Sequence, residues 1–330
     1  MKFNKKKAIW IAWERHRRSI ELAKAFNAKL FVLETTHNRL IKYTYLSVRT
    51  LSLIIREKPL IIFVQNPSII LATLLCIFKN FLNYQLITDR HSNFKLNTLN
   101  NRKLKWKLFH IFSKYSIRNA DLTIITNGYL CDIVTLWGGH GFVLQDKIPN
   151  LNFGEKIKLK GKKNIVFVST FSEDEPIIEV GGAAGLINNN WTIYITGNGD
   201  KYTHLDNLLL NLPNNVILTG YISEKEYQSL LLSADLLIVL TTMKHTLTCG
   251  AYEGIALLKP MILSDTIVIR EYFNKGVVYT KPNSCAIANA ISDSFLNESK
   301  LAKDIKTLRN ELLLDWEIRF NKLKNIIKML

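Results

Sequence analysis

The amino-acid sequence predicts an α/β protein made of two doubly wound domains. Apolar runs of strand length alternate with amphipathic helical stretches along the chain, which is typical of parallel sheets joined by crossover helices. The 330 residues are 48% hydrophobic and 22% charged, so the chain has a globular composition and the length of about two domains. A stretch without periodicity near the middle separates the two halves.

The predicted strands divide evenly between the halves. We expect them near residues 8–12, 30–33, 60–64, 84–88, 122–125 and 142–144, and near 165–169, 192–196, 216–218, 236–240, 261–263 and 277–279. The segment IPNLNFGEKIKLKGKKN, which begins at residue 148, carries Pro149, Gly154 and Gly161 among lysines, as a linker does. We therefore expect a first domain at 1–150, a linker at 151–161 and a second domain at 162–330, with the domains facing a cleft.

The start of the chain is interpreted as a strand rather than a targeting segment. It mimics a signal peptide, but only six apolar residues precede Glu14, fewer than the roughly 7 to 15 that such a segment needs. The four cysteines lie far apart and form no C-x-x-C pair. This spacing predicts reduced thiols in a cytosolic protein.

The positive charge is concentrated in the first half. The net charge is +17, and residues 1–150 hold 24 Lys and Arg against 8 Asp and Glu, whereas residues 151–330 hold 20 against 19. Nucleic acid, an acidic membrane surface and a phosphorylated lipid would all suit such a surface. Because no nucleic-acid module signature accompanies the charge, we expect an anionic lipid or membrane partner and no nucleic acid.

Two segments of the first half carry this charge to possible ligand positions. The first strand is followed by four basic residues, Arg15, His16, Arg17 and Arg18, at the point where an open α/β sheet borders its ligand crevice. They either bind a phosphorylated acceptor or form a solvated first turn.

Residues 69–78 are apolar all round but too few to span a bilayer, which takes about 20. They form either a buried crossover helix or an interfacial helix, and the lysines and aromatic residues that follow would suit lipid headgroups.

The segment from residue 235 to 265 predicts an anion site. It reads as a buried strand, a polar loop, a helix over about 248–257 and a second buried strand. A loop that feeds a helix N-terminus collects unpaired N–H groups and the positive end of the helix dipole. Glu253, one to two turns into the helix, is placed to accept hydrogen bonds from a vicinal diol. A sugar nucleotide carries a diphosphate and a diol; the alternative is an ordinary helix with a solvated Glu253.

This segment resembles the donor site of the GT-B glycosyltransferases, many of which carry two glutamates eight positions apart. Glu253 matches the second, which binds the nucleotide ribose, while His245 stands in place of the first. The resemblance implies that Thr246, Thr248 and Cys249 offer N–H and hydroxyl groups to the diphosphate and that His245 reaches the diphosphate or the sugar.

The same resemblance extends to other strand ends and to the last helix. Further donor residues are expected after three strands: Ser169, Thr170, Gly197, Asn198, Gly199 and Tyr221. The G-x-G phrase would let the main chain approach a ligand, although a plain turn is the alternative, and Tyr221 either approaches the base or packs at the surface. Ser172 and Glu175 have capping-box spacing, which predicts a helix start. The last helix either returns to the first domain, anchored by Trp316 and Phe320, or stays on the second.

A second resemblance concerns the first half. The phrase Gln65-Asn66-Pro67-Ser68, followed by a strand ending in Asp89-Arg90-His91, looks like the β-1,4-mannosyltransferases that act on dolichol-diphosphate chitobiose and their bacterial relatives, which have QNPP and Asp-Trp-His. The resemblance implies an inverting displacement in which a base removes the acceptor hydroxyl proton. We expect Asp89 as that base and His91 as its orienting residue or a contact to the acceptor diphosphate; a cap or an ion pair of Asp89 with Arg90 is the alternative.

Together these features predict a glycosyltransferase that moves a sugar from a UDP- or GDP-linked donor to a lipid-diphosphate-linked glycan in surface polysaccharide or glycoconjugate synthesis. The nucleotide sugar is a co-substrate, and no cofactor or metal is expected because no Asp-x-Asp motif occurs. We expect a cytoplasmic protein, peripheral on the inner face of the cell membrane. The alternatives are a retaining GT-B enzyme and a non-catalytic GT-B-like partner that binds anionic lipid.

Overall fold

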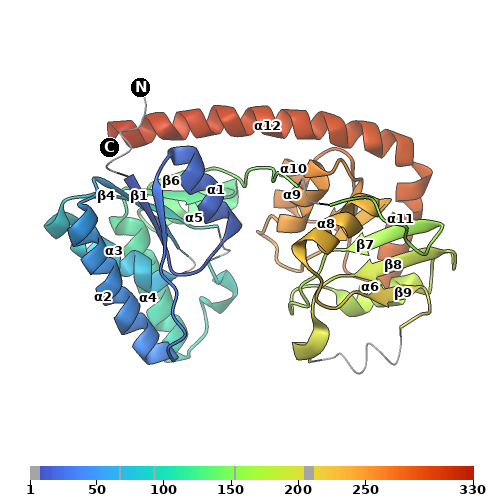
Figure 1. Ribbon diagram of the computed structural model, residues 1–330, viewed down its shortest axis with the longest axis horizontal. Coiled ribbons are helices and arrows are strands. Elements are labelled where there is room, and N and C mark those ends of the chain that lie inside the picture. Colours follow the sequence, from blue (N-terminus) through green and yellow to red (C-terminus); the bar gives the residue numbers. More distant parts are fainter. Residues whose placement is uncertain (1–7, 67, 92–93, 152–153, 204–211) are drawn as a thin grey trace. The chain divides into compact units, whose positions relative to one another are not determined.

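The computed structural model describes residues 8–66, 68–91, 94–151, 154–203 and 212–330, and Figure 1 shows its helices and strands. Pro67 of the QNPS phrase lies outside these residues. The chain divides into two compact units, the first made of Met1–Lys147 and Trp316–Leu330 and the second of Ile148–Asp315.

The first unit is built on a six-stranded parallel sheet with the order β2-β1-β3-β4-β5-β6. Its strands are β1 (Ala8–Ala12), β2 (Lys29–Val32), β3 (Ile61–Gln65), β4 (Gln85–Asp89), β5 (Leu122–Ile125) and β6 (Gly141–Val143). The register sets Asp89 at the end of β4 between Gln65 of β3 and Ile124 of β5. Asp89 therefore stands at the carboxyl edge of the sheet.

Helices cover both faces of this sheet. They are α1 (Arg17–Phe26), α2 (Arg39–Glu57), α3 (Ile69–Leu82), α4 (Leu104–Asn119) and α5 (Gly128–Leu136), with a 3-10 turn, η1 (Leu96–Thr98). The α2 and α3 helices pack on one face through a core that includes Leu46, Leu71 and Leu75. On the other face α1 packs with Trp316 and Phe320 of the last helix. The end of the chain is thus part of the first unit's core.

The second unit has its own six-stranded parallel sheet, with the order β12-β11-β10-β7-β8-β9. Its strands are β7 (Lys163–Phe167), β8 (Trp191–Ile195), β9 (Val216–Leu218), β10 (Leu236–Val239), β11 (Met261–Ser264) and β12 (Val277–Thr280). Its helices are α6 (Ile177–Ala184), α8 (Glu224–Ser233), α9 (Cys249–Ala256), α10 (Ile267–Tyr272) and α11 (Ser284–Leu296), with a 3-10 turn, η2 (Gly199–Lys201). The last helix, α12 (Glu298–Met329), begins in this unit and continues from Trp316 in the first. The α6 and α11 helices cover one face, and α9 and α10 the other.

The predicted α/β fold is confirmed. Every expected strand is present within two residues of its predicted bounds, and the helix expected at about 248–257 is α9. The predicted helix start at Ser172 is wrong, because α6 begins at Ile177. Glu175 instead accepts hydrogen bonds from the main chain of the preceding loop, which keeps that loop from continuing as helix.

The order of the strands fixes where ligands are expected. In an open parallel sheet ligands bind at the carboxyl edge, at the point where the order of the strands reverses. That point lies between β1 and β3 in the first unit and between β7 and β10 in the second. The polar residues picked out in the sequence after β4, β7 and β10 all lie at these carboxyl edges.

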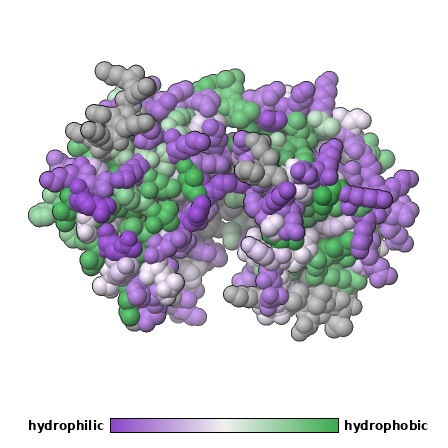
Figure 2. Space-filling view, in the orientation of Figure 1, coloured by the Kyte–Doolittle hydropathy of each residue, from purple (hydrophilic) through white to green (hydrophobic). Residues whose placement is uncertain are grey.

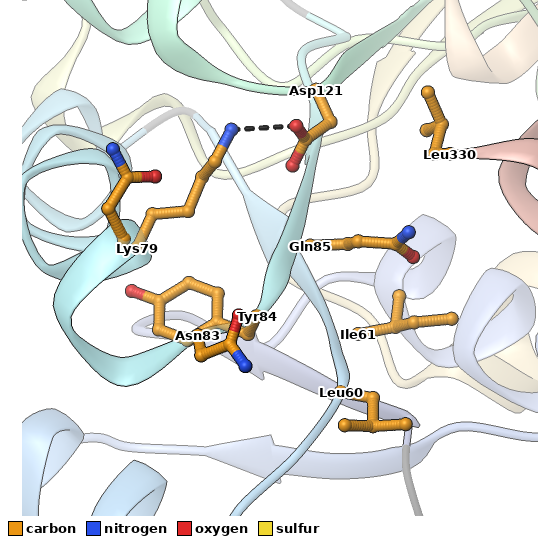
Figure 3. A pocket seen from close by; sticks show the side chains of 9 residues that line it. Leu60, Ile61, Lys79, Asn83, Tyr84, Gln85, Asp121 and Leu330 are labelled. Carbon is orange, nitrogen blue, oxygen red and sulfur yellow. Dashed lines mark hydrogen bonds and ion pairs between the residues drawn. The ribbon is translucent and has the colours of Figure 1, made fainter.

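A hollow of about 470 Å³ lies at the opposite edge of the first sheet, and Figure 3 shows its lining. Lys79 Nζ pairs with Asp121 Oδ1 at 2.6 Å, and Asp121 Oδ2 accepts a hydrogen bond from Leu86 N at 2.7 Å. These side chains fasten α3 to the amino ends of β4 and β5. The hollow therefore lies at the amino ends of the strands, away from the carboxyl edge where ligands of open parallel sheets bind.

Candidate functional site

In the second unit two loops meet at the point where the strand order reverses. The loop after β7 is tied to the loop after β10 through Asp174, whose Oδ2 accepts from Thr241 Oγ1 at 2.5 Å and whose carbonyl accepts from Thr242 N at 2.7 Å. Glu175 accepts from the Ser169 hydroxyl at 2.8 Å and from Thr170 N at 2.9 Å. The acidic cluster thus holds both loops in fixed positions.

The G-x-G phrase after β8 packs against this loop. Gly197 has φ of +101°, and a Cβ there would meet the Ser169 carbonyl oxygen at 2.6 Å, so only glycine allows the two loops to approach so closely. The side chain of Asn198 accepts from Asp200 N and begins the η2 turn at Gly199. Tyr221, after β9, is 86% exposed and lies at the surface of the unit.

Glu253 lies in the second turn of α9 and is buried. Its Oε2 accepts a hydrogen bond from the Tyr227 hydroxyl of α8 at 2.6 Å. Two glycines let α9 lie close to the sheet, since a Cβ at Gly250 would meet Val168 Cγ1 at 2.8 Å and one at Gly254 would meet Met261 Sδ at 2.2 Å. The Glu253 carboxylate is therefore held by a hydrogen bond from α8, and the helix that carries it, α9, packs closely against the sheet.

The start of α9 presents polar groups with capacity for a ligand. Thr248 is the N-cap residue, its side chain makes no capping bond, and its buried Oγ1 has no hydrogen-bond partner in the described chain. Burial, then repulsion from Lys244, lowers the pKa of His245, so a neutral imidazole precedes the helix. Thr246 and Cys249 lie in the same loop and first turn, and Cys249 is exposed. First-turn N–H groups and the helix dipole favour an anion at this position.

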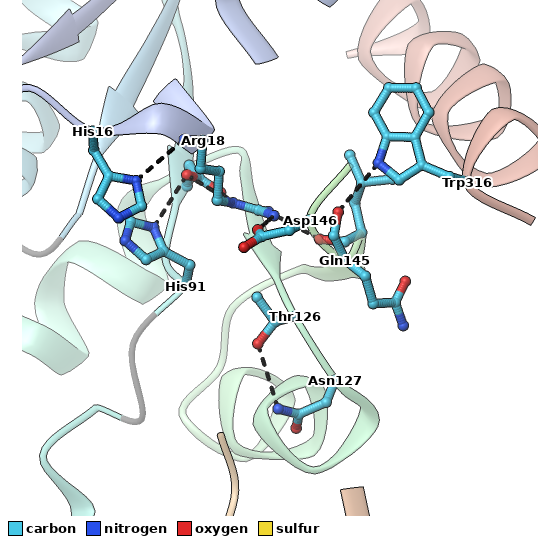
Figure 4. Close-up of polar contacts among 10 residues, drawn as sticks. His16, Arg18, His91, Thr126, Asn127, Gln145, Asp146 and Trp316 are labelled. Atoms are coloured by element: carbon cyan, nitrogen blue, oxygen red, sulfur yellow. Dashed lines mark hydrogen bonds and ion pairs between the residues drawn. The ribbon is translucent and has the colours of Figure 1, made fainter. Parts of the chain in front are cut away.

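In the first unit a buried ionic cluster surrounds Asp89, and Figure 4 shows its members Arg18, His91 and Asp146. The Asp89 carboxylate pairs with Arg18 Nε at 2.9 Å, and both side chains are almost fully buried. The guanidinium also donates to Asp146 and, at 2.9 Å, to the carbonyl of Leu144. Burial disfavours the charged carboxylate, yet Arg18 and the hydrogen bonds from His91 and Arg18 outweigh it and lower the pKa of Asp89. The ion pair with Arg90 that was the alternative for Asp89 is not formed, since the partner of Asp89 is Arg18.

Two imidazoles lie against this cluster. His91 Nδ1 is 3.3 Å from Asp89 Oδ2, and the rings of His16 and His91 stack at 4.5 Å. Because an ionised Asp89 only accepts, His91 Nδ1 carries the proton and its Nε2 is left as an acceptor. His16 Nδ1 accepts from Arg18 N as the N-cap of α1, so its Nε2 carries the proton. The pair therefore offers one donor and one acceptor.

The basic residues after β1 separate into buried and exposed groups. Arg18 is 3% exposed and its guanidinium is engaged within the unit, so it does not face a phosphate in this conformation. Arg15 is exposed, and its main-chain N–H donates to Glu34 Oε1. Of the basic residues after β1, Arg15, His16 and Arg17 are therefore those that solvent reaches.

Sequence reasoning missed several residues that hold the site. Asp146, which follows β6, and Tyr227, which precedes Glu253 by 26 positions, complete the two carboxylate arrangements. Arg90 is fully buried, and its Nε and Nη1 have no hydrogen-bond partner in the described chain. The position of Asp146 just after a strand was a usable signal, but no local pattern marks Tyr227.

Comparison with known proteins defines the class of protein. Residues 151–309, which include the β7 to α9 site, match the family described as glycosyl transferases group 1. The fold is that of the GT-B glycosyltransferases, and the chain is a glycosyltransferase enzyme. No curated protein sequence matches it.

Solved structures match the chain over nearly its whole length. Sucrose-phosphate synthase (tll1590) from Thermosynechococcus elongatus has a TM-score of 0.79 and 14% identity, with 98% of each chain covered. Anabaena Alr3699/HepE in complex with UDP has a TM-score of 0.74 and 13% identity, with 98% of this chain and 100% of that chain covered. HepE in complex with UDP-glucose has a TM-score of 0.74 and 13% identity, with 96% and 99% covered.

No helix of the described residues is long and apolar enough to cross a membrane. No group of three or more His, Cys, Asp and Glu side chains in this part of the chain is arranged to hold a metal ion.

Proposed function

We propose that the protein transfers a sugar from a nucleoside diphosphate sugar, bound by the second unit, to a lipid-diphosphate-linked glycan, bound by the first, at a membrane surface. The observation that carries the proposal is the buried Glu253 of α9, held by a hydrogen bond from Tyr227 of α8, together with Thr248 Oγ1 at the start of α9, which has no hydrogen-bond partner in the described chain. Both residues lie in the segment that matches the group 1 family. HepE, a protein of similar fold, binds UDP and UDP-glucose. The buried carboxylate suits the ribose diol, and the helix start suits the diphosphate.

The transfer is proposed to invert the anomeric carbon. The acceptor oxygen forms a bond to that carbon as the bond to the diphosphate oxygen breaks, and the hydroxyl proton passes to a base. The diphosphate that leaves is stabilised by the N–H groups and hydroxyls at the start of α9. Since these groups and the dipole supply the positive potential, we propose that the reaction needs no divalent metal.

The geometry favours His91 as the proton acceptor, with Asp89 as its positioning residue. Asp89 is buried, paired with Arg18 and has a lowered pKa, and a weak base takes up a proton poorly near neutral pH. An imidazole exchanges protons readily in that range, and His91 is partly exposed with Nε2 as acceptor. This assignment is the reverse of the one expected from the sequence, in which Asp89 is the base and His91 orients it.

The first test is thermal stabilisation by UDP, GDP, ADP and their sugars without added metal. One nucleotide family should raise the unfolding temperature by several degrees, because it binds the folded state, and Glu253→Gln should remove most of that rise. No rise with any nucleotide would favour a non-catalytic lipid-binding protein.

The second test separates the donor site from the base. His91→Ala and Asp89→Asn should keep the nucleotide-induced rise but lower turnover by about 100-fold or more. Asp89→Asn should also change the pH profile, since the amide no longer fixes the His91 tautomer. Full turnover in His91→Ala would refute the assignment of the base, and a product with retained configuration would refute the inverting reaction.

A further inference from the structure

One layer of three helices in the first unit exposes an unusual number of large apolar side chains. The α2, α3 and α4 helices lie side by side, with α3 in contact with both of the others (Figure 1). On each helix the exposed apolar residues recur at helical spacing and form a stripe: Ile41, Tyr45, Val48 and Ile55 on α2, Ile70, Ile77 and Phe81 on α3, and Leu104, Leu108, Ile111, Phe112 and Tyr115 on α4. We call this set the helical face.

The exposure is too large to be incidental. Phe81 is 84% exposed, Leu104 70% and Val48 64%. Single exposed apolar residues are normal, but contiguous patches beyond a few hundred Å² mark an interaction site. In Figure 2 hydrophobic residues gather among hydrophilic ones over the part of the first unit where Figure 1 draws α3 and α4.

The same layer is almost free of acidic residues. Residues 35–120 contain fourteen Lys and Arg but only two acids, Glu57 and Asp89. Glu57 pairs with Lys29 and Arg56, and Asp89 is buried against Arg18. Exposed cations flank the stripes: Arg49, Arg56, Arg102, Lys103, Lys105 and Lys107. The helical face is therefore apolar at its centre and cationic around it.

We infer that the helical face docks flat on a bilayer that contains anionic lipid, with its apolar stripes at the depth of the headgroups. Apolar side chains gain free energy by entering the interface, and lysines and arginines gain it from the negative surface potential. The inference deepens the proposed function, on which it rests for the lipid-linked acceptor, by naming the surface that meets the membrane.

The charge pattern distinguishes this occupant from two others. A second copy of the chain would bring like charges together across the interface. Nucleic acid would neutralise the cations but leave the apolar stripes in water, since its readers stack bases on aromatic rings or insert side chains into grooves. An anionic bilayer matches both features of the helical face.

The experiment measures binding of the whole chain to vesicles by flotation, without substrate. One set holds phosphatidylcholine alone, and the other holds phosphatidylcholine and phosphatidylglycerol in equal parts. We expect binding to the mixed vesicles only, weakened by salt. The triple variant Lys103→Glu, Lys105→Glu, Lys107→Glu should bind about 100-fold more weakly, and the triple variant Ile77→Ser, Phe81→Ser, Ile111→Ser about 10-fold or more.

Matched controls lie on α12. The triple variant Lys300→Glu, Lys303→Glu, Lys306→Glu changes the same charge, and Leu314→Ser with Ile318→Ser removes exposed apolar residues; both should bind vesicles like the wild type. Equal losses in control and test variants, no binding by the wild type, or conversion of a dimer to a monomer by the Ile77, Phe81 and Ile111 changes would overturn the proposal. Nucleotide-induced stabilisation is measured on every variant, so failure of the donor site is detected separately from failure of docking.

Discussion

Arg90 is a buried cation that has no counter-charge among the residues the structure describes. Its guanidinium lies 3.9 Å from the centre of the Phe94 ring, and Nε and Nη1 have no hydrogen-bond partner in the described chain. Burial lowers the pKa of Arg90 to about 9, so the side chain is still charged at neutral pH. Keeping this charge buried lowers the stability of the protein. The cation–π contact of Arg90 offsets only part of this loss.

We therefore expect Arg90→Met to stabilise the protein. Methionine fills a similar volume and removes the unpaired charge, so the free energy of unfolding should rise by about 1 to 3 kcal/mol. Chemical denaturation measures the change. Arg49, an exposed arginine 5.6 Å from the Tyr45 ring, provides the control, and Arg49→Met should change stability by less than about 0.5 kcal/mol. A less stable Arg90→Met protein would show that the guanidinium supports the fold.

His16 makes stability depend on pH near neutrality. Its pKa is lowered by burial and then by His91, while Asp146 and Asp89 act in the opposite direction. The folded state binds the His16 proton less tightly than the unfolded state does. The contribution of His16 to the free energy of unfolding is therefore present above the ordinary pKa of 6.5 and is lost as the pH falls below it. His110 and His245, whose pKa values are also lowered, contribute with the same sign.

The variant His16→Asn tests this contribution, since asparagine keeps an acceptor for the N-cap of α1 but does not titrate. The wild type should lose stability from about pH 7.5 to about pH 5.5, and the variant should lose less over the same range. Unfolding temperatures measured across that range give the two slopes. Identical slopes would mean that His16 does not bind a proton differently in the two states.

At the scale of single elements, apolar runs of strand length between amphipathic stretches were sufficient to place every predicted strand within two residues. Short buried strands bounded by polar residues leave a local signal. The error at Ser172 has a long-range cause, because Asp174 is hydrogen-bonded to Thr241, 67 residues away, and so holds this segment as a loop. The same limit explains why Arg18 was taken for a phosphate ligand, since its partners Asp89 and Asp146 are 71 and 128 residues away.

Two glycine substitutions should have opposite effects on the stability of the protein, because the space around the two glycines differs. Gly254→Ala should destabilise the protein by about 1 to 3 kcal/mol, because its Cβ would overlap buried Met261. Gly128→Ala, in the first turn of α5 with nothing within 4 Å of the new Cβ, should stabilise by about 0.5 to 1 kcal/mol. Denaturant titration compares the two. Nucleotide affinity should fall in Gly254→Ala alone. An unchanged affinity in that variant would mean that the packing of α9 against the sheet does not affect the donor site.

At the scale of the whole molecule, each unit has its own sheet and core, so each has the means to unfold separately. The last helix links them in sequence, since α12 begins in the second unit and its final part, Trp316–Leu330, belongs to the first. Trp316 Nε1 donates to the Gln145 carbonyl at 3.2 Å, and Phe320 lies 4.8 Å from the Phe26 ring. The sequence offered both outcomes for this helix, because its apolar spacing is the same whichever unit it covers.

Phe320→Ala should therefore lower the stability of the first unit in particular. Phe320 is 4% exposed, and truncating a buried aromatic side chain costs about 3 to 5 kcal/mol, whereas Ile318→Ala, at a 59% exposed position of the same helix, should cost less than about 1 kcal/mol. Calorimetry should show an early transition in Phe320→Ala that nucleotide does not shift, followed by a later one that it does, because the donor residues lie in the second unit. A single transition that moves as a whole would instead mean that α12 couples the two units into one cooperative system.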